Sequence, residues 1–333
     1  MMVAVEHKFV QYLLKNQIIF ALLIVASGWL ILELRGILIS LFISYILMAA
    51  LTPYVGNLQK RGLPKILAVL IPFIGIIILL FLLIFPLVPF FVEQVKSLIT
   101  GLPEYIKQSA NTVGFTIDAK QIQDFVTREI NGIGRNAFAV TTKVFGGLFS
   151  TLTVFVVSFY LLMDSARFKK WIATFFHSDS QNRVLTLLYQ VDDKLGAWLR
   201  GQIILSLFIG VITFITLTII GLPNALPLAL IAGLLEIVPT LGPILASIPA
   251  IIIGLTISPG MAIIVVVLYI IIQMLENNLL VPKIMQRAVG LNPVVVILGV
   301  VVGANLLGIA GALLSIPFIS LLAVLYRGFS SSE

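Results

Sequence analysis

The chain has 333 residues, of which 60% are hydrophobic and only 11% are charged, whereas charged residues make up roughly a quarter of a soluble domain. With a mean hydropathy of +1.14, this composition predicts an all-α integral membrane protein that crosses the bilayer several times. The chain has no cysteine and only two histidines, His7 and His177, so disulfides, thiolate metal sites and histidine-rich metal sites are not expected. Its net charge of +7 lies mostly in short loops, which suits membrane orientation better than nucleic-acid binding.

Residues 1–91 are predicted to form the N-terminal membrane spans. A first apolar run begins near Gln17 and continues, after a very short turn at Glu33–Gly36, into a second run that ends at Thr52–Pro53. The basic loop Lys60–Lys65 then leads to a third span. No small-residue cleavage site follows the first run, so this run is expected to be a span and not a cleavable signal peptide.

The polar middle of the chain is predicted to lie largely outside the bilayer. Residues 92–143 carry apolar side chains at helical spacing on one face and charges on the other, which indicates an extracytoplasmic amphipathic helical region. A packed helical subdomain and a substrate-specific lid are the two interpretations. Residues 144–165 are the fourth span, and residues 166–200 are cytoplasmic linker helices that begin with the basic and aromatic run Arg167–Trp171, as is typical of a cytoplasmic interface.

Two apolar segments of the C-terminal region, residues 201–333, are interrupted in their middles. The first runs from Leu226 to Ile257 and contains Glu236-Ile-Val-Pro-Thr-Leu-Gly-Pro243. The second runs from Pro293 to Tyr326 and is broken from Gly303 to Gly311. A membrane-spanning helix needs about 20 residues, and neither arm of the first segment is that long. Each segment is therefore either one strongly bent span or a re-entrant hairpin.

The distribution of basic residues favours hairpins in both segments. Cytoplasmic loops are enriched in lysine and arginine, and hairpins place Lys283, Arg287 and Arg327 all in the cytoplasm, whereas bent spans place the first two outside. The chain then has about eight hydrophobic segments, both termini in the cytoplasm, and a possible inverted repeat of a span followed by a hairpin. Such repeats are typical of secondary transporters, whose solute sites lie among broken helices near the midplane.

Polar residues in the two breaks and on the helix between them are the candidate binding residues. A carboxylate at membrane depth is costly and is a functional-site hypothesis by default, so Glu236 and Glu276 are candidates for binding a cation or a proton. Their alternative roles are structural, with Glu236 accepting from hairpin-tip amides and Glu276 lying at the interface. The other candidates offer hydrogen-bonding or freed backbone groups: Pro239, Thr240, Gly242, Pro243, Gln273, Asn277 and Asn305. For the neutral polar side chains the alternative is hydrogen bonding between helices.

Enzyme signatures are absent from the sequence. There is no Walker lysine after a glycine-rich loop, no nucleophile elbow and no zinc-binding histidine pair. No enzymatic activity, cofactor or metal is therefore expected, and transport would be driven by a solute, proton or sodium gradient.

Several short motifs, most of them after Arg200, form a recognisable set. They are Arg200-Gly-Gln202, Gly221-Leu-Pro223, Glu236 to Pro243, Gln273-Met-Leu-Glu-Asn277, Pro282, Gly290-Leu-Asn-Pro293 and Gly308 to Pro317, with further matches at Pro53 to Pro64 and Phe159 to Asp164. Over most of the chain this set resembles the autoinducer-2 exporter family. The resemblance implies a bacterial plasma-membrane permease. Some members are associated with export of autoinducer-2, a small polar quorum signal, and others with exchange of sodium or lithium for protons.

Three functional hypotheses follow from these observations. The first is a secondary transporter or exporter of a small polar solute such as autoinducer-2, with Glu236 or Glu276 coupling transport to protons. The second is a Na⁺(Li⁺)/H⁺ antiporter that uses the same carboxylates. The third is a non-transporting membrane scaffold whose functional surface is residues 92–143. The expected partners are the lipid bilayer, the solute or cation, and a second copy of the chain in a possible homo-oligomer.

Overall fold

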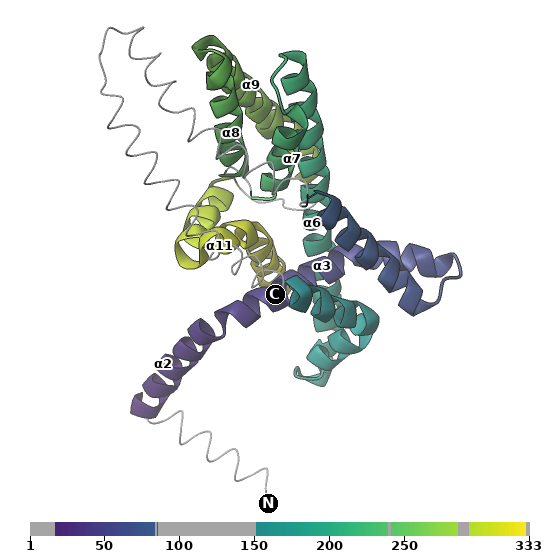
Figure 1. Ribbon diagram of the computed structural model, residues 1–333. Helices are drawn as coiled ribbons and strands as arrows, with labels where there is room; N and C mark the ends of the chain where they lie inside the picture. Colours follow the sequence, from purple (N-terminus) through teal and green to yellow (C-terminus); the bar gives the residue numbers. More distant parts are fainter. Residues whose placement is uncertain (1–16, 84, 86–150, 239–240, 286–292, 331–333) are drawn as a thin grey trace, which may run out of the picture.

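The computed structural model describes residues 17–83, 85, 151–238, 241–285 and 293–330, and this part of the chain folds into helices joined by short turns (Figure 1). The predicted amphipathic region, residues 92–143, lies outside the described residues. The helices are α2 (Gln17–Glu33), α3 (Arg35–Lys60), an unlabelled pair (Lys65–Leu83 and Thr151–Ala173), the 3-10 turn η1 (Ser178–Ser180), α6 (Gln181–Ile219), α7 (Ala225–Leu235), α8 (Leu241–Ile257), α9 (Pro259–Leu275), the π-helical turn η2 (Glu276–Leu280), α10 (Val281–Met285) and α11 (Pro293–Ser330).

The helices have the length and composition of membrane spans. Within the described residues, 6 helices are long and apolar enough to cross a bilayer, and α7 and α8 are shorter apolar helices. Large apolar side chains point outward along these helices; Leu207 is 68% exposed and Ile263 is 65% exposed. Such a surface is unfavourable in water but suits contact with lipid tails. The all-α, multi-pass membrane class predicted from composition is therefore confirmed.

The predicted short break between the first two spans falls at Leu34, between α2 and α3, but the chain does not reverse there. The backbone amide of Leu34 donates to the carbonyl of Leu30 at 2.9 Å, and the amide of Leu38 donates to the carbonyl of Leu34 at 3.0 Å, so helical hydrogen bonding passes through the junction. Figure 1 accordingly shows α2 extending onward from α3 instead of folding back beside it. Gly36 has no heavy atom within 4 Å of the position of a Cβ, and no packing contact there would hold a reversal of the chain.

Helix α3 continues past Pro53, where the sequence predicted its end. Proline has no amide hydrogen, so it leaves the carbonyl four residues earlier, that of Ala49, without its helical partner. The guanidinium of Arg200 on α6 donates to the carbonyls of Ala49 and Ala50, at 3.4 and 3.2 Å. The neighbouring Gly196 allows this approach, because a Cβ there would lie 2.5 Å from the Ala49 oxygen. The α3–α6 crossing therefore compensates for the proline inside the helix.

Helix α6 is one continuous helix of 39 residues. It includes residues 181–200 of the predicted cytoplasmic linker and the predicted fifth span, so the boundary expected after Arg200 lies inside a helix. Its buried residues from Val184 to Leu217 pack against α3, α7, α9, α10 and α11. Helix α6 thus contacts α7, α9, α10 and α11 of the C-terminal region.

Helices α7 and α8 form a hairpin whose two open ends lie together. After α6 the chain reverses through Gly221 and Asn224, both with positive φ, and α7 returns along α6. Gly210 and Gly233 allow close contact between these two helices. Helix α8 runs back beside α7 and then packs against α9, so that the end of α6 and the start of α9 lie at the same end of the group (Figure 1).

Helix α11 is also folded back on itself. Gly308 adopts φ 62° and ψ −141°, which divides the segment into two arms. The arms touch through their backbones, since a Cβ on Gly303 would lie 2.3 Å from the carbonyl oxygen of Gly311. Farther from the bend, Gly299 faces Ile319 of the other arm. Both segments that the sequence identified as broken therefore reverse direction at their breaks.

Candidate functional site

Glu236 occupies the C-terminal end of α7, at the break between α7 and α8. Its backbone amide completes the helix by donating to the carbonyl of Ala232 at 3.0 Å. Its own carbonyl accepts a hydrogen bond of 2.6 Å from Nε2 of Gln202 on α6. The short apolar helix α7 thus places the carboxylate of Glu236 in the protein interior. The neutral side chain of Gln202 holds the backbone at Glu236 through a hydrogen bond.

The turn after Glu236 is held by a close backbone contact. The amide of Gly242, the second residue of α8, donates to the carbonyl of Val238 at 2.9 Å. A Cβ at Gly242 would lie 2.1 Å from the carbonyl oxygen of Leu235, so a larger residue would push α8 away from the end of α7. Gly242 therefore has a structural role at the break, and the half-buried Pro243 follows it inside α8.

The carboxylate of Glu236 is enclosed without a donor. The residue is 0% exposed, and neither carboxylate oxygen has a hydrogen-bond partner among the described residues. A buried charge without compensation is strongly unfavourable. A buried carboxyl group is therefore expected to be paired with a cation, to be protonated, or to have a functional role.

Glu276 lies where α9 changes its winding. The regular helix ends at Leu275, and the next turn, Glu276–Leu280, is π-helical. Such turns are rare and are frequent at functional sites. Glu276 is 3% exposed, and its Oε2 accepts a hydrogen bond of 3.1 Å from Nε2 of Gln273. The sequence predicted a continuous helix here, because a π turn has no strong sequence signature.

The two carboxyl groups lie within interaction range of each other. Glu236 and Glu276 interact through their charges. Forty residues separate them along the chain, and the packing of α7, α8 and α9 brings them together. Each carboxylate is an acceptor only when ionised, so the pair can hydrogen-bond to each other only through a proton that one of them carries.

The other predicted residues fall into three groups. Gln273 lies beside the pair and donates to Glu276. Asn277 is exposed in the π turn, and Asn305 is exposed on the first arm of α11, where its Nδ2 donates to the carbonyl of Val301 at 3.0 Å. Pro239 and Thr240 lie outside the described residues. The structure thus joins Glu236, Gln273 and Glu276 and leaves the two asparagines apart from them.

Two buried polar groups near the pair were missed by the sequence analysis. Gln202 is 1% exposed, and Tyr269, two helical turns before Glu276, is 8% exposed with no partner for its hydroxyl among the described residues. A glutamine at the start of an apolar run was the available signal for Gln202. Tyrosine in a membrane helix is common at interfaces, so Tyr269 gave no distinguishing signal.

A second buried charge cluster joins α3, α6 and the helix Thr151–Ala173. Lys169 forms an ion pair with Asp192, and the two side chains are 4% and 8% exposed. The Tyr45 hydroxyl donates to Oδ1 of Asp192 at 2.5 Å, and the Lys169 ammonium lies 4.3 Å from the centre of the Tyr189 ring. The sequence placed Lys169 in a basic and aromatic run that is typical of a cytoplasmic interface. Within this run, the side chain of Lys169 points inward to a carboxylate.

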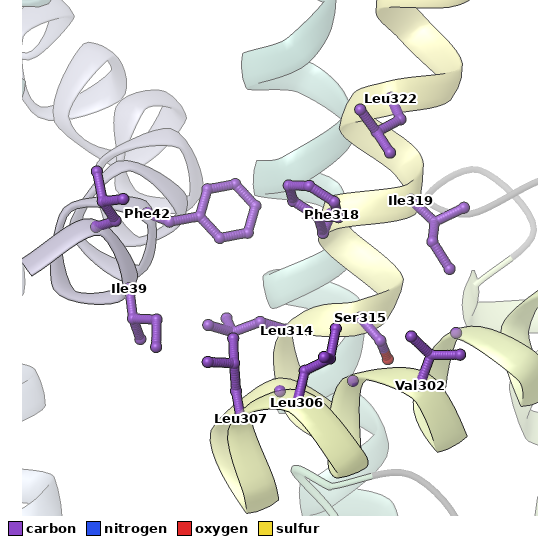
Figure 2. A pocket seen from close by; sticks show the side chains of 14 residues that line it. Ile39, Phe42, Val302, Leu306, Leu307, Leu314, Ser315, Phe318, Ile319 and Leu322 are labelled. Carbon is purple, nitrogen blue, oxygen red and sulfur yellow. The ribbon is translucent and has the colours of Figure 1, made fainter. Parts of the chain in front are cut away.

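A cavity of about 570 Å³ lies between α3 and the two arms of α11, away from the carboxyl pair. Figure 2 shows its lining of aliphatic and aromatic side chains, including Phe42 and Phe318, whose rings pack edge to face at 6.1 Å. Ser315 is its one polar side chain, and its Oγ already donates to the carbonyl of Ala312 at 2.7 Å. This cavity offers no partner to a polar solute. No group of three or more metal-ligating side chains occurs among the described residues.

The chain is similar to known transport proteins over nearly its whole length. The family model described as AI-2E family transporter matches residues 18–330. YrrI of Bacillus subtilis (strain 168), named as a candidate transport protein, is 30% identical over 319 residues, which cover 90% of this chain and 88% of the relative. TqsA of Escherichia coli (strain K12), named as an AI-2 transport protein, is 22% identical over 316 residues, covering 89% of this chain and 88% of TqsA. The chain therefore belongs to the AI-2E family of transporters, which are not enzymes.

Proposed function

We propose that this protein is a secondary transporter that moves a small polar solute across the bacterial plasma membrane, driven by a proton or ion gradient. The observation that carries the proposal is the buried carboxylate of Glu236 at the break between α7 and α8, which has no donor among the described residues. Broken helices with ionisable groups at membrane depth are how secondary transporters build solute and ion sites.

The arrangement of the two hairpins supports the same proposal. Both segments reverse at their breaks, and the α7–α8 hairpin opens at the end of the group where α6 ends and α9 begins. In the proposed topology both hairpins are re-entrant, enter from opposite sides of the bilayer and form an inverted repeat, with both chain termini in the cytoplasm. The tips of such hairpins offer freed backbone groups to a solute.

Autoinducer-2 is the first solute to test, and export is the proposed direction. The distant relative TqsA is named for transport of this signal. Gln273 and the buried carboxyl groups of Glu236 and Glu276 are described polar groups available for a small hydroxylated molecule, whereas the apolar cavity beside α11 is not suited to one.

The experiment is solute flux in liposomes that contain the purified full chain. A panel of small polar solutes, including autoinducer-2, is measured with and without an imposed proton gradient. We expect gradient-dependent flux of at least one solute and loss of that flux in E236Q. The matched control is E33Q, the same substitution at an exposed residue of α2, which should transport like the wild type. Equal flux in E236Q and wild type would contradict the proposed site.

The paired carboxyl groups also favour a second candidate, a Na⁺(Li⁺)/H⁺ antiporter. Two acidic side chains that interact through their charges can bind a small monovalent cation in exchange for a proton. The same liposomes distinguish the candidates. Proton movement that depends on Na⁺ or Li⁺, needs no organic solute and vanishes in E236Q would favour the antiporter over the solute transporter.

A further inference from the structure

The cavity of about 570 Å³ between α3 and the two arms of α11 is too large to be a packing defect. Packed interiors contain few voids larger than a water molecule, whereas sites for small molecules and cofactors occupy about 300–1,000 Å³. Figure 2 shows Ile39 and Phe42 of α3 on one side of this cavity, and Phe318 and Leu322 of α11 on the other. We call it the α3–α11 cavity, and its size is that of a ligand site.

The lining of the α3–α11 cavity suits an apolar occupant and not water. A buried water molecule needs 2–4 polar partners. Ser315 is the one polar side chain among the described residues that line the cavity, and its Oγ already donates to the carbonyl of Ala312 at 2.7 Å. An empty apolar cavity would lose the dispersion contacts of its whole lining. The occupant is therefore expected to be a hydrocarbon group.

The α3–α11 cavity opens toward the lipid. Val302, Leu306 and Phe318 line it and are nonetheless exposed at the protein surface. Helices α3 and α11 are both long and apolar enough to cross a bilayer, so the medium around these exposed side chains is the hydrocarbon of the membrane. An acyl chain of a neighbouring lipid can thus enter the cavity without crossing water.

The shape of the α3–α11 cavity also suits a linear chain. On the second arm of α11 the lining extends from Leu314 to Leu322, which is a rise of about 12 Å along a helix. The first arm and α3 line the cavity beside this stretch. The space is therefore elongated along the second arm, as an acyl chain requires.

The start of α3 provides a positive charge for a lipid headgroup. Arg35 precedes Leu38 and Ile39, two lining residues, by three and four positions, and therefore lies on the same face of α3. Its side chain is exposed and forms no ion pair with the described residues. A guanidinium binds phosphate oxygens through two parallel hydrogen bonds, so the charge of Arg35 is complementary to an anionic headgroup.

We propose that the α3–α11 cavity binds an anionic phospholipid of the surrounding membrane, with one acyl chain between α3 and the two arms of α11 and the headgroup at Arg35. This site goes beyond the proposed transport activity and does not depend on it. The ring pair of Phe42 and Phe318, at 6.1 Å, already joins α3 to α11 beside the cavity. The bound chain adds contacts on both sides of this pair and thereby holds the α11 hairpin to α3.

The test is photolabelling of the full chain in vesicles of phosphatidylcholine and phosphatidylglycerol. The probe is phosphatidylglycerol with a diazirine at the end of one acyl chain, and adducts are located by peptide mass spectrometry. In the wild type, we expect more adducts on peptides with Ile39 and Phe318 than on the exposed face of α9 around Ile263. In V302W the indole fills part of the cavity, so adducts at Phe318 should fall about tenfold, the effect of weakening binding by about 1.4 kcal/mol.

The matched control is V301W, because Val301 is 53% exposed against 55% for Val302 and does not line the cavity. It should be labelled like the wild type. If V302W does not fold, I39W replaces it, with I37W as the control at an exposed residue outside the lining. Equal labelling of the cavity variant and its control would overturn the proposal, as would wild-type adducts no more frequent at Phe318 than on α9. A protein segment, from a second copy or from this chain, would then fill the cavity in place of lipid.

The headgroup contact is tested with a second probe, in which phosphatidylcholine carries the same diazirine chain and its choline cation offsets the phosphate charge. The anionic probe should label the wild-type cavity more strongly than this neutral probe, and R35Q should lose the preference. The control R61Q, at the other, exposed end of α3, should keep it. A preference that R35Q retains, or a wild type without any preference, would overturn the assignment of the headgroup to Arg35.

Discussion

Replacing Lys169 by methionine should destabilise the protein strongly. The change removes the buried partner of Asp192, whose side chain is 8% exposed. Removing one partner of a buried ion pair costs about 3–5 kcal/mol, because the other charge is left uncompensated. The hydrogen bond from Tyr45 at 2.5 Å remains, so we expect the lower end of that range, about 3 kcal/mol.

The free energy of unfolding is measured in mixed micelles by titrating a denaturing detergent and following helix content by circular dichroism. The control is Lys170→Met, the same substitution at the adjacent exposed lysine, which should change stability by less than about 0.5 kcal/mol. The triple variant K169M/D192L/Y45F, which removes all three polar groups, should recover most of the loss, because an apolar replacement of a buried pair is often neutral.

Two results would refute this reasoning. Equal stability of K169M and the Lys170→Met control would mean that the Lys169–Asp192 pair contributes nothing. A triple variant as unstable as K169M would mean that lost packing around Lys169, and not the unpaired carboxylate, causes the destabilisation.

Two further predictions concern the two hairpins. Gly303→Ala should lower the free energy of unfolding by about 1–3 kcal/mol, the usual cost of overpacking, because the new Cβ would lie 2.3 Å from the Gly311 carbonyl oxygen. Thermal unfolding tests this, with Gly28→Ala as the control, because a Cβ at Gly28 would have nothing within 4 Å. Equal effects of the two substitutions would contradict the prediction. Gln202→Leu should lower the free energy of unfolding by about 1–3 kcal/mol, because it removes the buried donor to the Glu236 carbonyl. The detergent unfolding titration described for Lys169 measures this change. An unchanged free energy of unfolding would mean that this hydrogen bond does not stabilise the break between α7 and α8.

The sequence identified the buried carboxyl groups better than it identified which polar residues lie near them. Glu236 and Glu276 stood out because a carboxylate in an apolar segment is expensive wherever the chain folds. Asn277 and Asn305 met the same criterion of a polar group in an apolar stretch, yet both are exposed and neither lies with the pair. Helix rotation and the π turn after Leu275 decide which of these side chains point inward, and neither is encoded in a simple pattern of apolar residues.

Local sequence signals were also misleading where a distant residue supplied the missing group. Pro53 predicted a helix end, but Arg200 provides the donor that the freed carbonyl lacks. Lys169 belongs to a basic and aromatic run, and only the fold shows that Asp192 compensates its charge inside the protein. At Glu33–Gly36 the two helices meet at Leu34 without a reversal of the chain. For Pro53 and Lys169, the deciding interaction joins residues that are far apart in the chain.

The amino-acid sequence by itself determined the membrane class, the helical content and the positions of the two breaks, because these depend on composition, segment length, and the placement of proline and glycine. Only the tertiary structure decided that Glu236 and Glu276 are both buried and interact through their charges. Helix α8 packs against both α7 and α9, and the burial of the two side chains is a property of that packing and not of either residue's neighbours in the chain.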